Sequence, residues 1–167
     1  LAESLVQVVP GDPEDAVGRF VEILETFPSC YEKYFQIGAN AKLGLTTLEK
    51  EDSFIYSDLL KIMEESQLDF TETFVTLANG LEQSEVDPEF SKVAGLSDWI
   101  ERWSQRFTRE PGSVVDVAKR MQTVNPVIIP RNLKVEEALV AAESGDLEPT
   151  HRLLEAFKSP FSKTKEN

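Results

Sequence analysis

Two residue types that build many active sites are almost absent from this sequence. Cys30 and His151 are the only cysteine and the only histidine among 167 residues. A single cysteine cannot form an internal disulfide, so a disulfide-stabilised secreted scaffold is excluded and a reducing compartment is favoured. One of each is also too few for a zinc site, which uses three or four such ligands. We expect a surface histidine and a small buried thiol, not a metal centre or a Cys–His catalytic pair.

Positive charge, long apolar runs and clustered glycines are also scarce. The chain has 17 Lys and Arg residues against 30 Asp and Glu residues, a net charge of -13, which argues against a nucleic-acid groove because phosphates require clustered cations. No apolar run approaches the roughly 18 residues that span a membrane. The 8 glycines are scattered, and neither GxxxxGK[ST] nor GxGxxG occurs. The sequence predicts a soluble chain with no nucleic-acid or membrane partner and no nucleotide-binding loop of its own.

The chain does contain apolar residues at helical spacing, in runs separated by capping residues. Ser29, Thr46 and Asp69 each precede a glutamate by three residues, which is the capping-box pattern, and Phe27–Pro28 is expected to stop the first helix. The markers of the predicted helices are Asp12 to Phe27, Ser29 to Gly44, Thr46 to Met63, Asp69 to Gly80, Leu96 to Phe107, Ser113 to Met121, Asn132 to Gly145 and Glu148 to Phe157. Among them, Ser113 is a predicted N-cap and Gly44 a predicted left-handed C-cap.

The predicted fold class is all-α. No stretch of five or more residues alternates strictly between apolar and polar, and the helix lengths vary too much for stacked repeats. We expect a single compact bundle of about seven or eight helices around one core, forming one domain over residues 1–167. Residues 82–89 are interpreted as a solvated loop and residues 158–167 as a frayed tail. Because LAESL at residues 1–5 already has helical spacing, the chain is expected to be part of a longer protein.

An unusual segment, VNPVIIPR at residues 124–131, precedes the last two predicted helices. Its two prolines bracket three β-branched residues, and each proline disfavours helix in the residue before it. An extended connector is therefore predicted. Arg131 and Asn132 would follow it with a fork of N–H donors and an amide at a fixed position, which suits binding another segment's carbonyls or carboxylates. In the alternative, Arg131 is solvated and Asn132 caps the next helix.

Two further functions stay open on the residues. Trp99 and Trp103, interleaved with Arg102 and Arg106, either pack in the core or form the surface of a free-standing helical adaptor, and their burial decides between the two. A carboxylate hydrolase would need two acids converging in a cleft, with at least one raised pKa. The adjacent pairs Glu64–Glu65 and Glu136–Glu137 point to different parts of a helix surface, so they do not supply that convergence.

Two long runs resemble the C-terminal part of the selenoprotein O family, also called YdiU or UPF0061. They are MQTVNPVIIPRNLKVEEAL at 121–139 and GDLEPTHRLLEAFKSPF at 145–161. Upstream, AKLGL at 41–45, DLLKIM at 58–63 and DFTETF at 69–74 are similar to family segments in the same order, and LAESL resembles the helix that closes the family's kinase-like core. Leu133 stands where the family usually has histidine, and Thr150–His151 replace a common phenylalanine and its neighbour.

The resemblance implies a parent protein that transfers AMP from ATP to hydroxyls of protein substrates, using a divalent metal such as Mg²⁺. Its catalytic residues would lie before Leu1, and its redox cysteine or selenocysteine after Asn167, so no catalytic, cofactor-binding or metal-binding residue is carried over. The chain is then a non-catalytic helical domain that packs on the kinase-like core, with Asn125, Arg131 and Asn132 as the interdomain contact. The resemblance also implies self-association through the exposed interdomain face, and a bacterial cytoplasmic or eukaryotic mitochondrial location.

Overall fold

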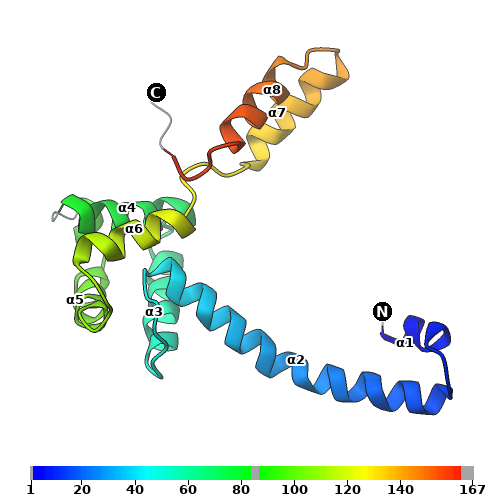
Figure 1. Ribbon diagram of the computed structural model, residues 1–167. Coiled ribbons are helices and arrows are strands. Elements are labelled where there is room, and N and C mark those ends of the chain that lie inside the picture. The colour runs from blue at the N-terminus through cyan, green and yellow to red at the C-terminus, as the bar shows by residue number, and fades with distance from the viewer. Residues whose placement is uncertain (1, 84–86, 163–167) are drawn as a thin grey trace. The chain divides into compact units, whose positions relative to one another are not determined.

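All regular structure in this computed structural model is helical over the residues it describes, 2–83 and 87–162 (Figure 1). The α-helices are α1 (Ala2–Leu5), α2 (Pro13–Lys42), α3 (Asp52–Glu65), α4 (Phe70–Gln83), α5 (Leu96–Phe107), α6 (Val114–Val124), α7 (Asn132–Glu143) and α8 (Glu148–Phe157), and two short 3-10 segments are η1 (Val6–Val8) and η2 (Phe90–Lys92). The all-α fold class is therefore confirmed, and the described residues form eight α-helices, within the predicted number.

The chain divides into two compact units, Leu1–Gly38 and Ala39–Asn167. The first unit contains α1, η1 and most of α2. The second contains the last turn of α2 and every later helix. The assignment of residues 1–167 to one domain stays a prediction.

Helix α2 passes through a proline. The prediction that the first helix stops at Pro28 is wrong, because α2 is a single helix of 30 residues with Pro28 in its interior. An internal proline costs about 3 kcal/mol or more, since it lacks the N–H that would reach the carbonyl four residues back. The hydroxyls of Thr26 and Ser29 donate to the carbonyls of Ile23 and Thr26, at 2.7 and 3.0 Å. Ser29 thus bonds within one helix and does not cap a second.

The first unit buries very few side chains. Among its described residues only Ala16 is buried. The rings of Phe27, Tyr31 and Phe35 stack along α2 with neighbouring centroids 6.0 and 5.9 Å apart, and all three are exposed. We call these three residues the α2 aromatic row. Cys30 on the same helix is also exposed, so the expected buried thiol is wrong.

The second unit encloses a continuous apolar core. Within it α3 packs on α5, and α4 packs on α6. Trp99 and Trp103 on α5 are 0% and 1% exposed, and their indole N–H groups donate to the carbonyls of Ile55 and Leu43 at 2.7 and 3.1 Å. The larger side chains around them in this core are Leu43, Leu45, Ile55, Tyr56, Leu59, Met63, Phe74, Leu77, Leu96, Phe107, Val117 and Met121.

A tight turn at Gly44 fixes the end of α2 against α6. The φ of Gly44 is +74°, the left-handed conformation expected of the predicted C-cap, and a Cβ there would lie 2.7 Å from Val117 Cγ1 and 2.8 Å from the Val117 carbonyl oxygen. Backbone conformation and close approach therefore both require glycine. The Gly44 carbonyl also accepts a hydrogen bond from Arg120 Nε at 2.9 Å.

Two predicted helix caps are confirmed. Asp69 Oδ1 accepts a hydrogen bond from the backbone N–H of Glu72 at 2.9 Å, immediately before α4. Ser113 and Asp116 form a reciprocal capping box at the start of α6. Each arrangement satisfies backbone N–H groups that a helix start leaves unpaired.

Three other boundary predictions are wrong. Thr46 caps no helix, because α3 starts only at Asp52. Gly80 lies buried inside α4, where close packing outweighs its helix-propensity cost of about 1 kcal/mol. Asn132 is the first residue of α7, because the cap position is taken by the extended backbone of Arg131, without a side-chain cap. Of the predicted loop 82–89, the first two residues end α4, and residues 84–86 lie outside the described part.

The connector after α6 is extended as predicted, beginning with Asn125 at φ -100° and ψ 105°. The backbone N–H groups of Val127 and Ile128 donate to the Pro160 carbonyl at 2.8 and 3.0 Å. This pairs the connector with the segment that follows α8, while α7 and α8 pack on each other between them (Figure 1). The predicted frayed tail is thus held to the connector at Pro160, and its residues 163–167 lie outside the described part.

Candidate functional site

The side chain of Asn125 is engaged within the second unit. Asn125 is 3% exposed, and its Nδ2 donates to the carbonyls of Lys42 and Met121 at 2.9 and 3.0 Å. Its Oδ1 accepts from Lys42 Nζ at 3.1 Å. Both amide protons and the oxygen are therefore used inside the unit, and they tie the end of α2 to the end of α6.

Lys42 is held in a partly apolar environment at this point. Its ammonium lies 5.0 Å from the ring centroid of Phe70 and 5.0 Å from that of Phe74, so the rings attract the cation while they remove water from it. Burial lowers the pKa of Lys42 below its usual value. The ammonium thus links α2, α4 and the connector.

Arg131 forms an ion pair within the chain. Its Nη1 donates to Asp69 Oδ2, and both side chains are partly exposed. The Arg131 hydrogen bond, followed by the backbone N–H of Glu72, lowers the pKa of Asp69 to about 2. This pair links the start of α7 to the start of α4. Asn132, the third predicted contact residue, is exposed.

Three of the runs that carry the family resemblance meet at this place in the fold. AKLGL at 41–45 supplies Lys42, DFTETF at 69–74 supplies the cap of α4 and both rings, and the run at 121–139 supplies Asn125 and Arg131. We call Lys42, Asp69, Asn125 and Arg131 the motif junction. Its geometry joins helices of this unit and brings no catalytic group to a cleft.

A buried ion network is the strongest electrostatic feature of the second unit. Arg106 is 1% exposed. Its Nε donates to Asp52 Oδ1 at 2.6 Å, and its Nη1 donates to Glu110 Oε1 at 2.8 Å. Asn40 donates to Asp52 Oδ2 at 2.6 Å, and the Thr46 hydroxyl donates to Glu110 Oε2 at 2.6 Å. Such a network is stable only when every buried charge keeps its partners.

The two carboxylates of this network have lowered pKa values. Burial raises the pKa of Asp52, but hydrogen bonds from Arg106, the Glu49 backbone and Asn40 outweigh burial and lower it. Burial likewise opposes ionisation of Glu110, but hydrogen bonds from the threonines at 46 and 47 and from Arg106 bring its pKa down to about 2. Both groups are therefore ionised near neutral pH. The hydrolase alternative required convergence with a raised pKa, and this pair shows convergence with lowered values.

The position of Arg106 in the sequence indicated this network. Residue spacing alone, however, could not distinguish a buried arginine from one on an exposed interaction surface. Arg106 lies three residues after Trp103 and directly before Phe107, on the buried face of α5. An arginine at a core position of an amphipathic helix predicts a buried acidic partner. Which of the 30 acids would reach it was decided by the packing of α3 and α5.

The remaining sequence candidates are placed as follows. Both tryptophans are buried with their N–H groups bonded, which disfavours the adaptor surface. His151 is exposed, as expected. Over the described residues, no group of three or more His, Cys, Asp or Glu side chains is placed to hold a metal ion. No helix in that part of the chain is long and apolar enough to cross a bilayer.

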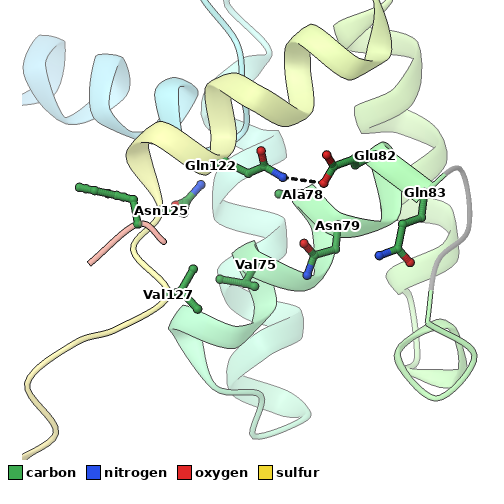
Figure 2. Close-up of a pocket in the computed structure, with 9 residues that line it drawn as sticks. Val75, Ala78, Asn79, Glu82, Gln83, Gln122, Asn125 and Val127 are labelled. Atoms are coloured by element: carbon green, nitrogen blue, oxygen red, sulfur yellow. Dashed lines mark hydrogen bonds between the residues drawn. The ribbon is translucent and has the colours of Figure 1, made fainter. Parts of the chain in front are cut away.

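A cavity of about 270 Å³ lies between α4, the end of α6 and the connector. We call it the α4–α6 cavity. Figure 2 shows Asn79 and Gln83 projecting from α4, and the Gln122–Glu82 hydrogen bond of 2.9 Å joining α6 to α4. Its lining residues are Val75, Ala78, Asn79, Glu82, Gln83, Gln122, Asn125, Val127 and Phe161. The described part of this lining contains no lysine, arginine or histidine, and so offers no counter-charge to a nucleotide phosphate.

Fold and site together define an all-α unit whose motif residues serve interhelical packing. Residues 1–158 match the family model described as protein adenylyltransferase SelO, and the chain belongs to that family. It is 39% identical over 163 residues to the protein nucleotidyltransferase YdiU of Cereibacter sphaeroides, covering 97% of this chain and 33% of that protein.

Two further relatives of the same name agree with this. The protein of Anoxybacillus flavithermus is 40% identical over 162 residues, with 96% of this chain and 32% of the relative covered. That of Rhizobium meliloti is 36% identical over 166 residues, with 96% and 34% covered. The chain thus spans about a third of the length of the curated relatives it matches, and the predicted resemblance to the family is confirmed.

Proposed function

We propose that this chain is a non-catalytic helical domain that supports the kinase-like core of a SelO-type protein AMP-transferase. The observation that carries the proposal is the α2 aromatic row, which is exposed on a helix whose unit has almost no core of its own. Rows of large apolar side chains seldom stay uncovered in a soluble protein. In a chain spanning a third of its relatives' length, the remainder of the parent is the partner that covers them.

The chemistry of the described residues supports a role without catalysis. ATP and Mg²⁺ are the cofactors proposed for the parent. The described carboxylates form no cluster placed to hold a metal ion, and the lining residues described for the α4–α6 cavity include no cation for a phosphate. The residues present do not fit a nucleotide with its metal, so we assign nucleotide binding and AMP transfer to protein substrates to the rest of the parent.

The proposed interdomain contact rests on Arg131 and Asn132 more than on Asn125. The Asn125 amide is fully bonded inside the unit. Arg131 is exposed and bonds Asp69 through Nη1, which leaves further guanidinium N–H groups for a carboxylate or carbonyl of the core. Asn132 beside it is exposed at the start of α7. This role is a proposal for both residues.

Substituting the centre of the α2 aromatic row tests the proposal. Tyr31→Ser is expected to change the free energy of unfolding of the isolated chain by less than about 0.5 kcal/mol, because the ring is exposed. In the intact parent the same change should cost about 2 to 4 kcal/mol, because the ring is then buried. Denaturant unfolding of both proteins, together with AMP transfer by the parent, measures this. An equally small effect in both would remove the supporting role.

A second variant tests the contact itself. Arg131→Ala in the intact parent should lower both the melting temperature and AMP transfer. An unchanged melting temperature with unchanged AMP transfer would remove Arg131 from the interface.

The proposed self-association is tested by sedimentation of the isolated chain. It predicts a concentration-dependent dimer that Tyr31→Ser weakens.

A further inference from the structure

The polar side chains that line the α4–α6 cavity are not explained by the proposed supporting role. One complete face of α4 lines it, since Val75, Ala78, Asn79, Glu82 and Gln83 follow at i, i+3, i+4, i+7 and i+8. Helix faces of a support element are usually apolar and covered. This face carries two carboxamides and a carboxylate beside two small apolar side chains.

The carboxamide of Asn79 is the central polar group of the cavity. Asn79 is only partly exposed, and over the described residues its side chain makes no hydrogen bond. Asn125, at the opposite wall, has its amide fully engaged. A carboxamide presents a donor and an acceptor side by side, which is the pattern that complements the N–H and C=O of a peptide group. Because Asn79 is partly exposed, its carboxamide can exchange bound water for the peptide group of a ligand.

The charge of the cavity selects among such ligands. Among the described residues of the lining, Glu82 is the only ionisable one, and Gln122 Nε2 donates to one of its oxygens at 2.9 Å, so the other oxygen is available to a cation. The chain as a whole carries a net charge of -13. Both features attract basic segments and repel phosphates and carboxylates. The apolar side chains of Val75, Val127 and Phe161 line the rest of the cavity.

We propose that the α4–α6 cavity binds an extended peptide segment of a partner protein, in which an apolar side chain is followed or preceded by lysine or arginine. Asn79 bonds the peptide group between them, Glu82 pairs with the cation at the rim, and the apolar side chain packs against Val75, Val127 and Phe161. With a volume of about 270 Å³, the cavity limits the recognised unit to a short segment.

Fluorescence anisotropy with short capped peptides on the intact parent tests this inference, and it requires no AMP transfer. The probes are fluorescein-labelled hexapeptides of glycine and alanine that carry Leu-Lys or Lys-Leu at the centre, each compared with the same peptide carrying glutamate for lysine. The lysine peptides should bind and the glutamate peptides should not. Asn79→Ala should weaken the lysine peptides about fivefold through the lost amide bonds, and Glu82→Gln about threefold through the lost ion pair.

Glu64→Gln is the matched control. It removes one exposed carboxylate from α3, outside the cavity, and should leave the affinity unchanged. The proposal is overturned if none of the peptides binds, or if Glu64→Gln weakens binding as much as Glu82→Gln, since the attraction would then be a general one to an acidic surface. Spermidine competing as well as a lysine peptide would assign the cavity to a small polyamine and overturn the peptide assignment. Because binding is measured directly, a negative result here leaves the AMP-transfer proposal untouched, and the reverse also holds.

Discussion

The two units of this chain use the same kind of helix in different ways. In Leu1–Gly38, α2 exposes nearly all its large apolar side chains, and only Ala16 is buried among the described residues. In Ala39–Asn167, α5 buries two tryptophans and an arginine almost completely, and both indole nitrogens and all three guanidinium nitrogens of Arg106 donate to an acceptor. The second unit is therefore stabilised by its own contacts. The first has the composition of an element that is stabilised by contact with something else.

The difference shows that amphipathic spacing indicates a helix but not what covers it. Both α2 and α5 carry large apolar residues at helical spacing, although the two faces of α5 are more sharply separated. The distinguishing signs are polar: α5 carries Arg106 on its buried face, and acids from α3 and from the turn after α5 close around it. Over the described residues, no comparable network of buried charges surrounds the α2 aromatic row.

The largest expected effect is a loss of stability of the second unit when its buried arginine is removed. Arg106→Met leaves the carboxylates of Asp52 and Glu110 buried without their cation, and should cost about 3 to 5 kcal/mol of unfolding free energy. Arg102→Met is the control on the same helix. Arg102 pairs with Asp58 on the surface, so that change should cost less than about 1 kcal/mol. Urea unfolding of the isolated chain measures both, and equal losses would mean that the buried network is not what stabilises the unit.

The next largest effects on stability come from substituting two glycines, one in each unit. One substitution should destabilise the chain and the other should stabilise it. Gly44→Ala forces a Cβ into a left-handed residue and against Val117, and should cost about 2 to 4 kcal/mol. Gly38→Ala, in α2 at the end of the first unit, meets nothing within 4 Å and should stabilise the helix by about 0.5 to 1 kcal/mol. Thermal unfolding followed by circular dichroism tests both. Destabilisation by Gly38→Ala would mean that α2 is covered there.

The pH dependence of stability should come from the second unit. The pKa of Glu110 is lowered from 4.5 to about 2. A lowered folded-state pKa means that the stabilisation is complete above the unfolded value of 4.5 and is lost as the pH falls through about 2, up to about 3 kcal/mol. Unfolding free energies measured from pH 6 downward should show this loss. Glu110→Gln should be less stable at pH 6 and lose less between pH 4.5 and pH 2. If the unfolding free energy of Glu110→Gln falls with pH in parallel with that of the unsubstituted chain, another group causes the pH dependence.

The smallest expected effect concerns the surface pair of the motif junction. In the isolated chain Arg131→Ala should cost less than about 1 kcal/mol, because the pair with Asp69 is partly exposed. The pKa of Asp69, about 2 with the arginine present, should rise toward its usual range, which NMR titration of the carboxyl group measures. A large stability loss would place Arg131 in the support of the second unit itself, and would weaken its proposed part in the interdomain contact.

Much of the helical organisation was accessible from local chemistry, and the errors have local explanations too. The caps at Asp69 and Ser113 were predicted because a side chain satisfies backbone groups two or three residues away. The sequence predicts a helix end at Pro28 because the local rules weigh the proline alone, whereas α2 continues through it as one helix of 30 residues. Thr46 was assigned as a cap because its pattern fitted, but its partner is Glu110, 64 positions away.

The predicted contact residues show the same limit in the candidate site. The sequence predicts one joint contact for Asn125, Arg131 and Asn132, because the first two lie in the extended connector and the third follows it directly. Asn125 bonds Lys42 and Arg131 bonds Asp69, pairs separated by 83 and 62 positions in the sequence. The α4–α6 cavity gave no sequence signal, because its lining comes from four segments that become neighbours only after folding.

Local side-chain chemistry, read along the chain, was enough to establish helices, an extended connector, the scarcity of metal ligands and the family. Those properties depend on residues within a few positions of each other, or on runs compared directly. Tertiary structure alone decided which acids meet Arg106, which tryptophan faces become buried and which aromatic row stays exposed. Each of those outcomes depends on contacts between distant segments, whose free energy is realised only when the helices pack.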